Sequence, residues 1–318
     1  MKIFVTGGAG FIGSNFIHYI LNNYDDHIIN FDKLTYAGNI KNLEDIEAAA
    51  NYQFFKGDIL DKDRMKKIFL KENIDYLVNF AAESHVDRSI NDSSQFIKTN
   101  IEGTHNLLEL ALEFDIKKFV QISTDEVYGS LDDRGFFREI DILNPTNPYA
   151  ASKAAADMIV NSFYKTYGVS INICRSSNNF GPYQHPEKLI PLSIINALNG
   201  RQLPLYGDGK NIRDWIYVKD NCRALDAVMR KGKVGEIYNI GAGNEKTNLE
   251  VAKNILKILN KNKNLIKFVK DRKAHDYRYA LNTDKIREEL NWETEQEFYP
   301  ALEKTAVWYS QHPDWWDN

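Results

Sequence analysis

A tyrosine and a lysine stand four residues apart in the segment NPYAASKAAADMIV, as Tyr149 and Lys153. On a helix this separation puts both side chains on one face, so they can act on the same substrate. A phenol with an ordinary pKa of about 10 is a poor base at neutral pH, but a nearby ammonium group and a helix N-terminus both favour its ionised form. We therefore predict that Lys153 lowers the pKa of Tyr149, making it a base that can help to oxidise a hydroxyl group.

Three polar residues, Thr124, Asp125 and Glu126, stand where the apolar run KKFVQIS ends. Open α/β sheets bind ligands at the carboxyl ends of their strands, so the Thr124 hydroxyl can bond the oxygen that Tyr149 deprotonates. Two adjacent carboxyl groups are unnecessary for hydride transfer alone. Because like charges and burial separate paired pKa values, one can serve as an acid and the other as a base. The pair indicates elimination of water, and an exposed acidic turn is the weaker alternative between these flanking residues.

Glycines Gly7, Gly10 and Gly13 follow the first apolar run and precede the helical segment SNFIHYILNN. They permit a tight turn, approach of the backbone to a pyrophosphate, and close packing, while the helix N-terminus faces the phosphates. Asp32 ends the next run, where a carboxylate accepts hydrogen bonds from a ribose and repels a 2′-phosphate. The pattern predicts NAD rather than NADP, although the neighbouring Lys33 could tolerate a phosphate. A plain strand-to-helix turn beside a solvated acid is the structural alternative.

The elements that must position these residues follow from an alternation along the chain. Up to about residue 175, six short β-rich runs alternate with amphipathic segments, which predicts a Rossmann-type, doubly wound parallel sheet. Asp58 follows the third run and is placed for the adenine. We expect residues 1–175 to bind NAD together with returning segments at roughly 214–243. The loop-rich remainder, 176–318, predicts a smaller, interleaved α/β substrate-binding lobe.

Composition narrows the class of protein. The 318 residues carry a net charge of −4 without a basic run, so nucleic acid is not an expected partner. Neither a signal peptide nor a membrane span is evident, and we expect a cytoplasmic enzyme. The two cysteines, Cys174 and Cys222, lie far apart without metal-type spacing, so neither a disulfide nor a metal site is predicted.

Cationic side chains recur in the loops of the second half. Lys188, Arg213, Arg272 and His275 stand in the segments HPEKLIP, YGDGKNIRDW and DRKAHDYRYA. A nucleotide diphosphate needs such donors, and arginine can grip it with two hydrogen bonds. Surface charge is the alternative for any single residue, but the surrounding aromatic and amide side chains favour a binding site.

The chain resembles the dTDP-glucose 4,6-dehydratase family of extended short-chain dehydrogenases/reductases over nearly its whole length. The resemblance is carried by STDEVYG, NPYAASKAAAD, FDKLTYAGN, FAAESHVDRSI, SSNNFGPYQ and RDWIYVKD. Asp125 and Glu126 discriminate best, because related sugar epimerases have small residues there. One departure is that Lys273 and Ala274 replace the family's usual Pro-Gly pair, so we expect the backbone of this loop to differ.

The resemblance implies a reaction on dTDP-glucose with retained NAD. Tyr149 removes the proton of the 4-hydroxyl as hydride passes from C4 to NAD; Glu126 then removes the C5 proton while Asp125 protonates the departing 6-hydroxyl. Return of hydride to C6 and of a proton to C5 gives a 4-keto-6-deoxy sugar, which commonly feeds deoxysugars such as rhamnose. A 4-epimerase or decarboxylase on the same fold, or a redox-inactive NAD-sensing protein, remains an alternative. A homodimer through helices near residues 95–112 and 150–166 is also implied.

The same resemblance distributes the remaining site residues between cofactor and substrate. Around NAD it places Gly7, Gly10, Phe11, Ile12, Gly13, Asp32, Lys33, Leu34, Thr35, Asp58, Ile59, Ala81, Ala82, Ser84, Thr99, Tyr149, Lys153 and Asn179. Around the nucleotide sugar it places Ser84, His85, Thr124, Asn178, Lys188, Leu189, Pro204, Tyr206, Arg213, Asn248, Arg272, His275 and Asp276.

Overall fold

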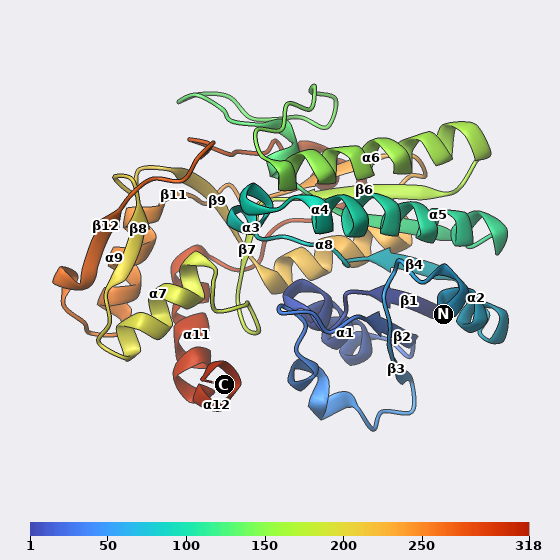
Figure 1. The fold of residues 1–318 in the computed structure, drawn as a ribbon, viewed down its shortest axis with the longest axis horizontal. Helices are drawn as coiled ribbons and strands as arrows, with labels where there is room; N and C mark the ends of the chain where they lie inside the picture. The colour runs from blue at the N-terminus through green and yellow to red at the C-terminus, as the bar shows by residue number, and fades with distance from the viewer. Residues whose placement is uncertain (318) are drawn as a thin grey trace.

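A seven-stranded parallel sheet forms the centre of the protein in a computed structural model that describes residues 1–317. The strands lie in the order β10-β6-β5-β4-β1-β2-β3 (Figure 1). Their bounds are β1 Lys2–Thr6, β2 His27–Asp32, β3 Tyr52–Lys56, β4 Tyr76–Asn79, β5 Lys118–Thr124, β6 Ile171–Ser176 and β10 Ile237–Ile240. The order reverses direction between β1 and β4, which is where open α/β sheets bind ligands. The predicted Rossmann-type fold is confirmed.

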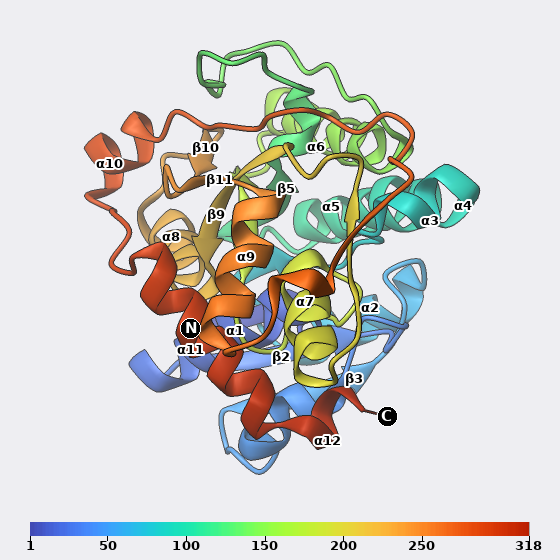
Figure 2. The ribbon, with the colours of Figure 1, turned by 90° about the vertical axis from the view of Figure 1, so that its left-hand side faces the viewer.

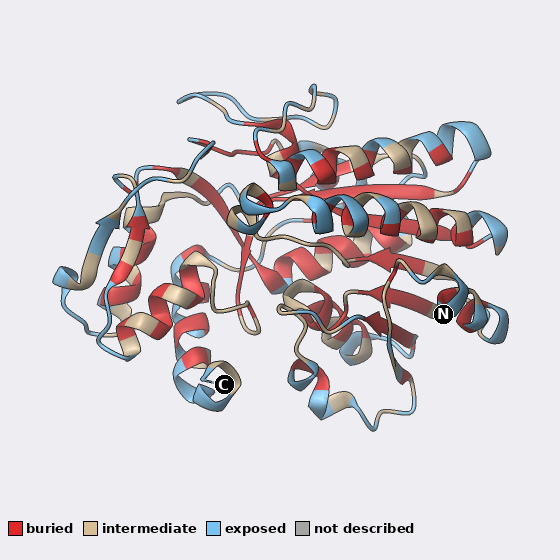
Figure 3. Ribbon diagram, in the orientation of Figure 1, coloured by how far each residue is buried: buried red, intermediate tan, exposed pale blue. Residues whose placement is uncertain are grey.

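Helices cover both faces of this sheet. One face packs against α1 (Phe11–Asn23), α8 (Val218–Lys231) and α10 (Asp284–Leu290), and the other against α2 (Lys62–Lys71), α5 (Thr104–Glu113) and α6 (Pro148–Tyr167). Because side chains alternate along a strand, β1 directs Ile3 and Val5 into the first core and Phe4 into the second. Figure 3 shows the buried residues on the strands and on the inward faces of the helices.

A smaller lobe stands beside the carboxyl ends of the central strands (Figure 2). It contains β7 Asn178–Phe180, α7 Leu189–Leu198, β8 Leu203–Tyr206, β9 Ile212–Tyr217, β11 Glu245–Thr247, α9 Asn248–Ile258, β12 Ile266–Val269, α11 Phe298–Gln311 and α12 Pro313–Trp316. Its sheets have the orders β11-β9-β7 and β12-β8, and aromatic and aliphatic side chains of α7, α9 and α11 form its core.

Short helices make up the connections. They are η1 Ile40–Ile46, α3 Val86–Asn91, α4 Ser94–Phe96, η2 Ile97–Gly103, η3 Asp125–Tyr128 and η4 Lys263–Leu265. Across residues 1–317, none of the helices has both the length and the apolar character needed to cross a bilayer.

The turn between β1 and α1 depends on glycine at two positions. Gly7 has a φ of 69°, and a Cβ there would lie 2.6 Å from the backbone nitrogen of Ala81. A Cβ on Gly13 would lie 2.4 Å from the carbonyl oxygen of Gly7, so any side chain would push α1 away from the turn. A Cβ on Gly10 meets only that same oxygen, at 3.2 Å, and the space beside it is open. Gly13 therefore serves packing, whereas Gly10 leaves room beside the backbone.

We expect Gly13→Ala and Gly10→Ala to separate these two roles. Gly13→Ala overpacks the turn, a change that typically costs about 1–3 kcal/mol, and should lower the melting temperature. Gly10→Ala should leave the melting temperature nearly unchanged but reduce bound NAD, because its methyl group stands where the backbone must approach the pyrophosphate. Thermal unfolding and the NAD content of the purified proteins measure the two effects. Equal loss of stability in both variants would contradict this division.

Candidate active site

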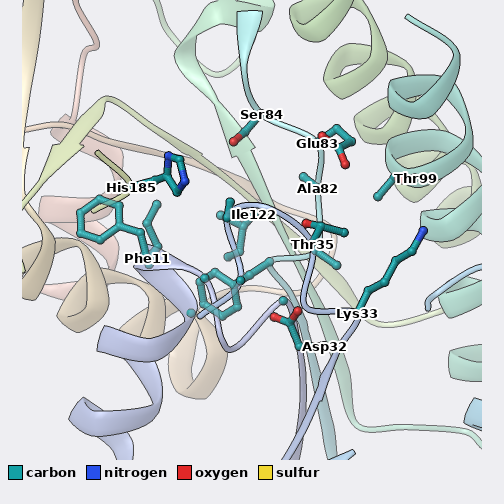
Figure 4. Close-up of a pocket in the computed structure, with 18 of the residues that line it drawn as sticks. Phe11, Asp32, Lys33, Thr35, Ala82, Glu83, Ser84, Thr99, Ile122 and His185 are labelled. Atoms are coloured by element: carbon teal, nitrogen blue, oxygen red, sulfur yellow. The ribbon is translucent and has the colours of Figure 1, made fainter. Parts of the chain in front are cut away.

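The first cavity lies at the carboxyl edge of the central strands, and we call it the cofactor cavity. Figure 4 shows Phe11 and His185 on one side of it, Thr99 on the other and Asp32 near its base. Sixteen of the residues expected around NAD line it: Gly7, Gly10, Phe11, Ile12, Gly13, Asp32, Lys33, Thr35, Asp58, Ile59, Ala81, Ala82, Ser84, Thr99, Tyr149 and Lys153. Leu34 and Asn179 do not line it; Leu34 supports Asp32 from behind, and Asn179 lines the neighbouring cavity.

Asp32 is held at the end of β2 by two backbone hydrogen bonds. The amide of Ala9 donates to one carboxylate oxygen at 2.9 Å, and the amide of Leu34 donates to the other at 2.7 Å. Burial raises the pKa of Asp32, and these bonds oppose the rise. Lys33 forms an ion pair with Asp58 at 2.7 Å and is therefore engaged by a carboxylate. A fixed carboxylate, a neutralised lysine and the open space beside Gly10 fit NAD, with its free ribose diol.

The Tyr-Lys pair lies on α6, whose N-terminus is capped by the side chain of Asn147. The Lys153 ammonium donates to the carbonyl oxygen of Ile122 at 2.5 Å, and burial lowers the pKa of Lys153 to about 8. The pKa of Tyr149 is raised, first by removal from water and then by the charge of Glu126, with Thr124 opposing the rise. The net lowering of the Tyr149 pKa that the Tyr-Lys spacing predicts is not found, because desolvation outweighs the opposing contribution. A positive charge bound in the cavity would act against this rise.

Asp125 and Glu126 occupy different environments although they are adjacent in η3. Asp125 is only 2% exposed, accepts a hydrogen bond from the Thr124 hydroxyl at 3.2 Å, and lines neither cavity. Its second oxygen has no partner in residues 1–317. Burial, and then the charge of Glu126, raise the pKa of Asp125 well above its usual value, which favours the protonated form.

Glu126 faces the second cavity. Desolvation raises the pKa of Glu126, but Arg213 and a hydrogen bond from Asn147 at 3.3 Å oppose the rise. Burial and the charge of Glu126 thus favour the protonated form of Asp125, whereas Arg213 favours the ionised form of Glu126, and general acid and base catalysis requires such a difference between neighbouring groups.

The second cavity lies between the sheet and the smaller lobe, and we call it the substrate cavity. Eleven of the expected substrate residues line it: His85, Asn178, Lys188, Leu189, Pro204, Tyr206, Arg213, Asn248, Arg272, His275 and Asp276. The other two lie elsewhere, because Ser84 lines the cofactor cavity and Thr124 is buried at the end of β5. Arg272 forms an ion pair with Asp87 at 2.7 Å, and its guanidinium lies over the Tyr206 ring. A diphosphate would therefore compete with Asp87 for this arginine.

The loop before α7 joins the two cavities. Gln184, Glu187 and Lys188 line both of them, and the Lys188 ammonium donates to the carbonyl oxygen of Ser84 at 2.9 Å. Glu187 lies 3.3 Å from the Arg88 guanidinium and 3.4 Å from the His85 imidazole. In this loop only Lys188 was predicted to belong to the site; Gln184 stood at the end of the motif SSNNFGPYQ and Glu187 next to Lys188, but neither was predicted to line a cavity.

A dinucleotide cavity that opens onto a Tyr-Lys helix and continues into a cavity lined by cations defines an NAD-dependent short-chain dehydrogenase/reductase. The comparison with protein families narrows this class. The family model described as GDP-mannose 4,6 dehydratase matches residues 4–305, and the chain belongs to this family.

Known proteins resemble the chain over its whole length. The low-salt glycan biosynthesis protein Agl12 of Haloferax volcanii is 51% identical over 97% of this chain and 98% of its own. The dTDP-glucose 4,6-dehydratase of Bacillus anthracis, solved in complex with NAD, is 50% identical with a TM-score of 0.94 and covers 100% of this chain and 99% of its own. DesIV of Streptomyces venezuelae, a dTDP-glucose 4,6-dehydratase solved with NAD, is 45% identical with a TM-score of 0.97 and the same coverage.

The raised pKa of Asp125 has a consequence for stability. Above the ordinary carboxyl pKa of 3.8, the folded protein holds the Asp125 proton while the unfolded chain releases it, so stability falls as pH rises towards the folded-state value. Asp125→Asn cannot ionise, and its melting temperature relative to the unmodified protein should therefore increase from about pH 4 to about pH 8. Thermal unfolding across this range measures the difference. Asp25→Asn, at an exposed position, is the control. If the melting temperatures of Asp125→Asn and the unmodified protein change with pH in parallel, Asp125 does not have a raised pKa.

Proposed function

We propose that the protein converts dTDP-glucose to dTDP-4-keto-6-deoxyglucose by removing water. The observation that carries the proposal is the pair of adjacent carboxyl groups, Asp125 and Glu126, in different environments beside Tyr149. Oxidation alone needs no such pair, whereas elimination needs an acid and a base together. The names of the Bacillus and Streptomyces relatives support dTDP-glucose as the substrate.

Bound NAD accepts hydride from C4 of the glucosyl group and returns it to C6, so the reaction has no net redox change. Tyr149 takes the proton of the 4-hydroxyl, and Thr124 hydrogen-bonds the same oxygen. The new carbonyl acidifies the C5 hydrogen, which Glu126 removes as a proton, and a proton returns to C5 when hydride is added to C6. Asp125 protonates the 6-hydroxyl so that it leaves as water; one of its carboxyl oxygens has no hydrogen-bond partner among residues 1–317 and can hold this proton. Each general acid or base typically contributes about 100- to 10,000-fold to the rate.

The division between cofactor and substrate residues forms part of the proposal. Residues 1–175, with the returning segment near 214–243, hold NAD, and the rest of the chain mainly holds the nucleotide sugar. Lys188, Arg213 and Arg272 bind the diphosphate, because each places its charge at the substrate cavity. Asn178, Asn248, Pro204 and Tyr206 assist recognition of the sugar and the base.

Two other functions share part of this site. A nucleotide-sugar 4-epimerase would use the glycine turn and the Tyr-Lys pair but has no step that requires Asp125 and Glu126. A redox-inactive NAD sensor would not need Tyr149 and Lys153 at the cofactor cavity, nor Thr124 at the end of the strand beside it. Dehydration gives a role to each of the residues named in this comparison.

Incubation of the purified protein with dTDP-glucose, without added cofactor, tests the reaction. We expect NMR and mass spectrometry to show loss of water, with bound NAD unchanged at the end. Glu126→Gln should still oxidise C4 but stall before elimination and accumulate reduced cofactor, seen by its absorbance, whereas Tyr149→Phe should block the first step. Normal turnover by Glu126→Gln would exclude Glu126 as the base. A galactose configuration without mass change would indicate an epimerase, and no reaction with any nucleotide sugar would favour a sensor.

We also propose that the protein is a cytoplasmic homodimer that contributes to the synthesis of deoxysugars such as rhamnose. The support for a dimer is a group of exposed apolar side chains on neighbouring helices. Met158 and Tyr167 on α6 are 60% and 56% exposed, and Leu112 on α5 is 41% exposed. Two copies of the α5-α6 surface would bury these side chains around a two-fold axis. Assignment to carbohydrate synthesis is supported by the name of the Haloferax relative.

Met158→Glu should convert such a dimer to monomers, because a charge would be buried at its centre. Leu70→Glu is the matched control, since Leu70 is 69% exposed but lies on α2. Sedimentation velocity measures the oligomeric state of all three proteins. A monomeric unmodified protein, or a dimeric Met158→Glu variant, would exclude this interface.

A further inference from the structure

The C-terminal helix α12 contacts a segment from the beginning of the chain. The indole nitrogen of Trp315 donates a hydrogen bond to the side-chain oxygen of Asn42, in η1, at 2.7 Å. The ammonium of Lys41 lies 3.5 Å from the carbonyl oxygen of Asp314. Figure 2 shows α12, at the red end of the chain, near the blue N-terminal segments. Residues 273 positions apart in sequence are therefore joined here.

Asn42 connects this contact to the glycine turn. Its side chain is only 1% exposed, and its amide nitrogen donates to the carbonyl oxygen of Ala9 at 2.9 Å. Ala9 in turn donates its backbone N–H to the carboxylate of Asp32 at 2.9 Å. A continuous series of three hydrogen bonds thus runs from Trp315 to the carboxylate that faces the ribose of NAD.

Aromatic side chains also hold Trp315 and Asn42 in place. The Trp315 ring packs edge-on against Trp308, with 5.2 Å between ring centroids, and lies tilted against Tyr183 at 6.3 Å. Tyr183 stacks on His18, whose Nε2 lies 2.7 Å from the backbone carbonyl oxygen of Asn42. Asn42 is therefore held through its backbone as well as through its side chain.

The segment that contains Ala37 and Gly38 forms a thin wall of the cofactor cavity. These two residues line the cofactor cavity on one side. On the other side they line a separate hollow, distinct from the substrate cavity, whose walls include Trp315 and Trp316. The backbone amide of Asn39, the next residue, donates to the carbonyl oxygen of Ala9 at 3.0 Å, the same oxygen that Asn42 bonds. Movement of this wall away from the cavity would break the bonds to Ala9.

We propose that Trp315 is a positioning residue that acts through Asn42 to keep this wall closed and to slow the release of NAD. The proposal rests on the binding of NAD and on no particular sugar substrate. A cofactor that gives back its hydride within one turnover must stay bound, so the proposed dehydration would benefit from slow release. Failure of the sugar assignment would leave the measured release of NAD unaffected, and the two proposals can therefore fail separately.

Trp315→Phe and Trp316→Phe provide a matched test. Each keeps an aromatic ring and loses one indole N–H, but the N–H of Trp316 donates to the carbonyl oxygen of Tyr309 at 2.9 Å, within the C-terminal segment. The release rate of NAD from the holoenzyme is measured by exchange with isotopically labelled NAD, and the melting temperature is measured alongside. We expect Trp315→Phe to release NAD about fivefold faster, the change typical of one lost hydrogen bond, without a matching loss of stability. Trp316→Phe should release it at the unmodified rate.

Asn42→Ala tests whether the effect passes through Asn42. In that background Trp315→Phe should cause no further acceleration, because the connection is already broken. Additive effects of the two substitutions would overturn the proposal. So would an unchanged release rate in Trp315→Phe, equal acceleration in Trp315→Phe and Trp316→Phe, or acceleration that only follows a lowered melting temperature. If Asn42→Ala does not fold, the two tryptophan variants still decide the question.

Discussion

Removal of water from the carboxyl edge of the central sheet is the constraint on which the chemistry of this protein depends. Desolvation is the largest influence on each of the four ionisable groups there. It raises the pKa of Asp125, Glu126 and Tyr149, and it lowers the pKa of Lys153 to about 8. Burial therefore disfavours the charged form of each group, and for Glu126 the positive charges of Arg213 and Lys188 oppose this effect.

The position of α6 depends on a buried ion pair between this helix and β6. Arg175 on β6 contacts Asp157 on α6 at 2.9 Å, and both side chains are nearly inaccessible to solvent. Tyr128, at the end of η3, accepts a hydrogen bond from the same guanidinium at 2.8 Å. This group links the strand, the helix that carries Lys153 and the short helix that carries Asp125. Removing either charge would leave the other buried without a partner, which typically costs about 3–5 kcal/mol.

The smaller lobe completes the site by placing positive charge near Glu126. Glu126 is stabilised as a carboxylate chiefly by Arg213, which comes from β9, and the loop before α7 lines both cavities. The sheet edge supplies the reacting groups, and the lobe supplies the electrostatic environment and the walls. The sheet edge and the smaller lobe are both needed to give Asp125 and Glu126 different environments.

Local patterns determined the fold and most of the candidate site. The glycine turn, Asp32, the Tyr-Lys spacing and the residues after β5 were recognisable because each depends on neighbours within one strand, turn or helix. The ion pair of Lys33 with Asp58, the raised pKa of Tyr149 and the shared loop residue Glu187 were decided only by the tertiary structure. So was the connection from Trp315 to Asn42. Each of these features depends on burial or on contacts between distant segments. The spacing of residues along the chain predicts neither.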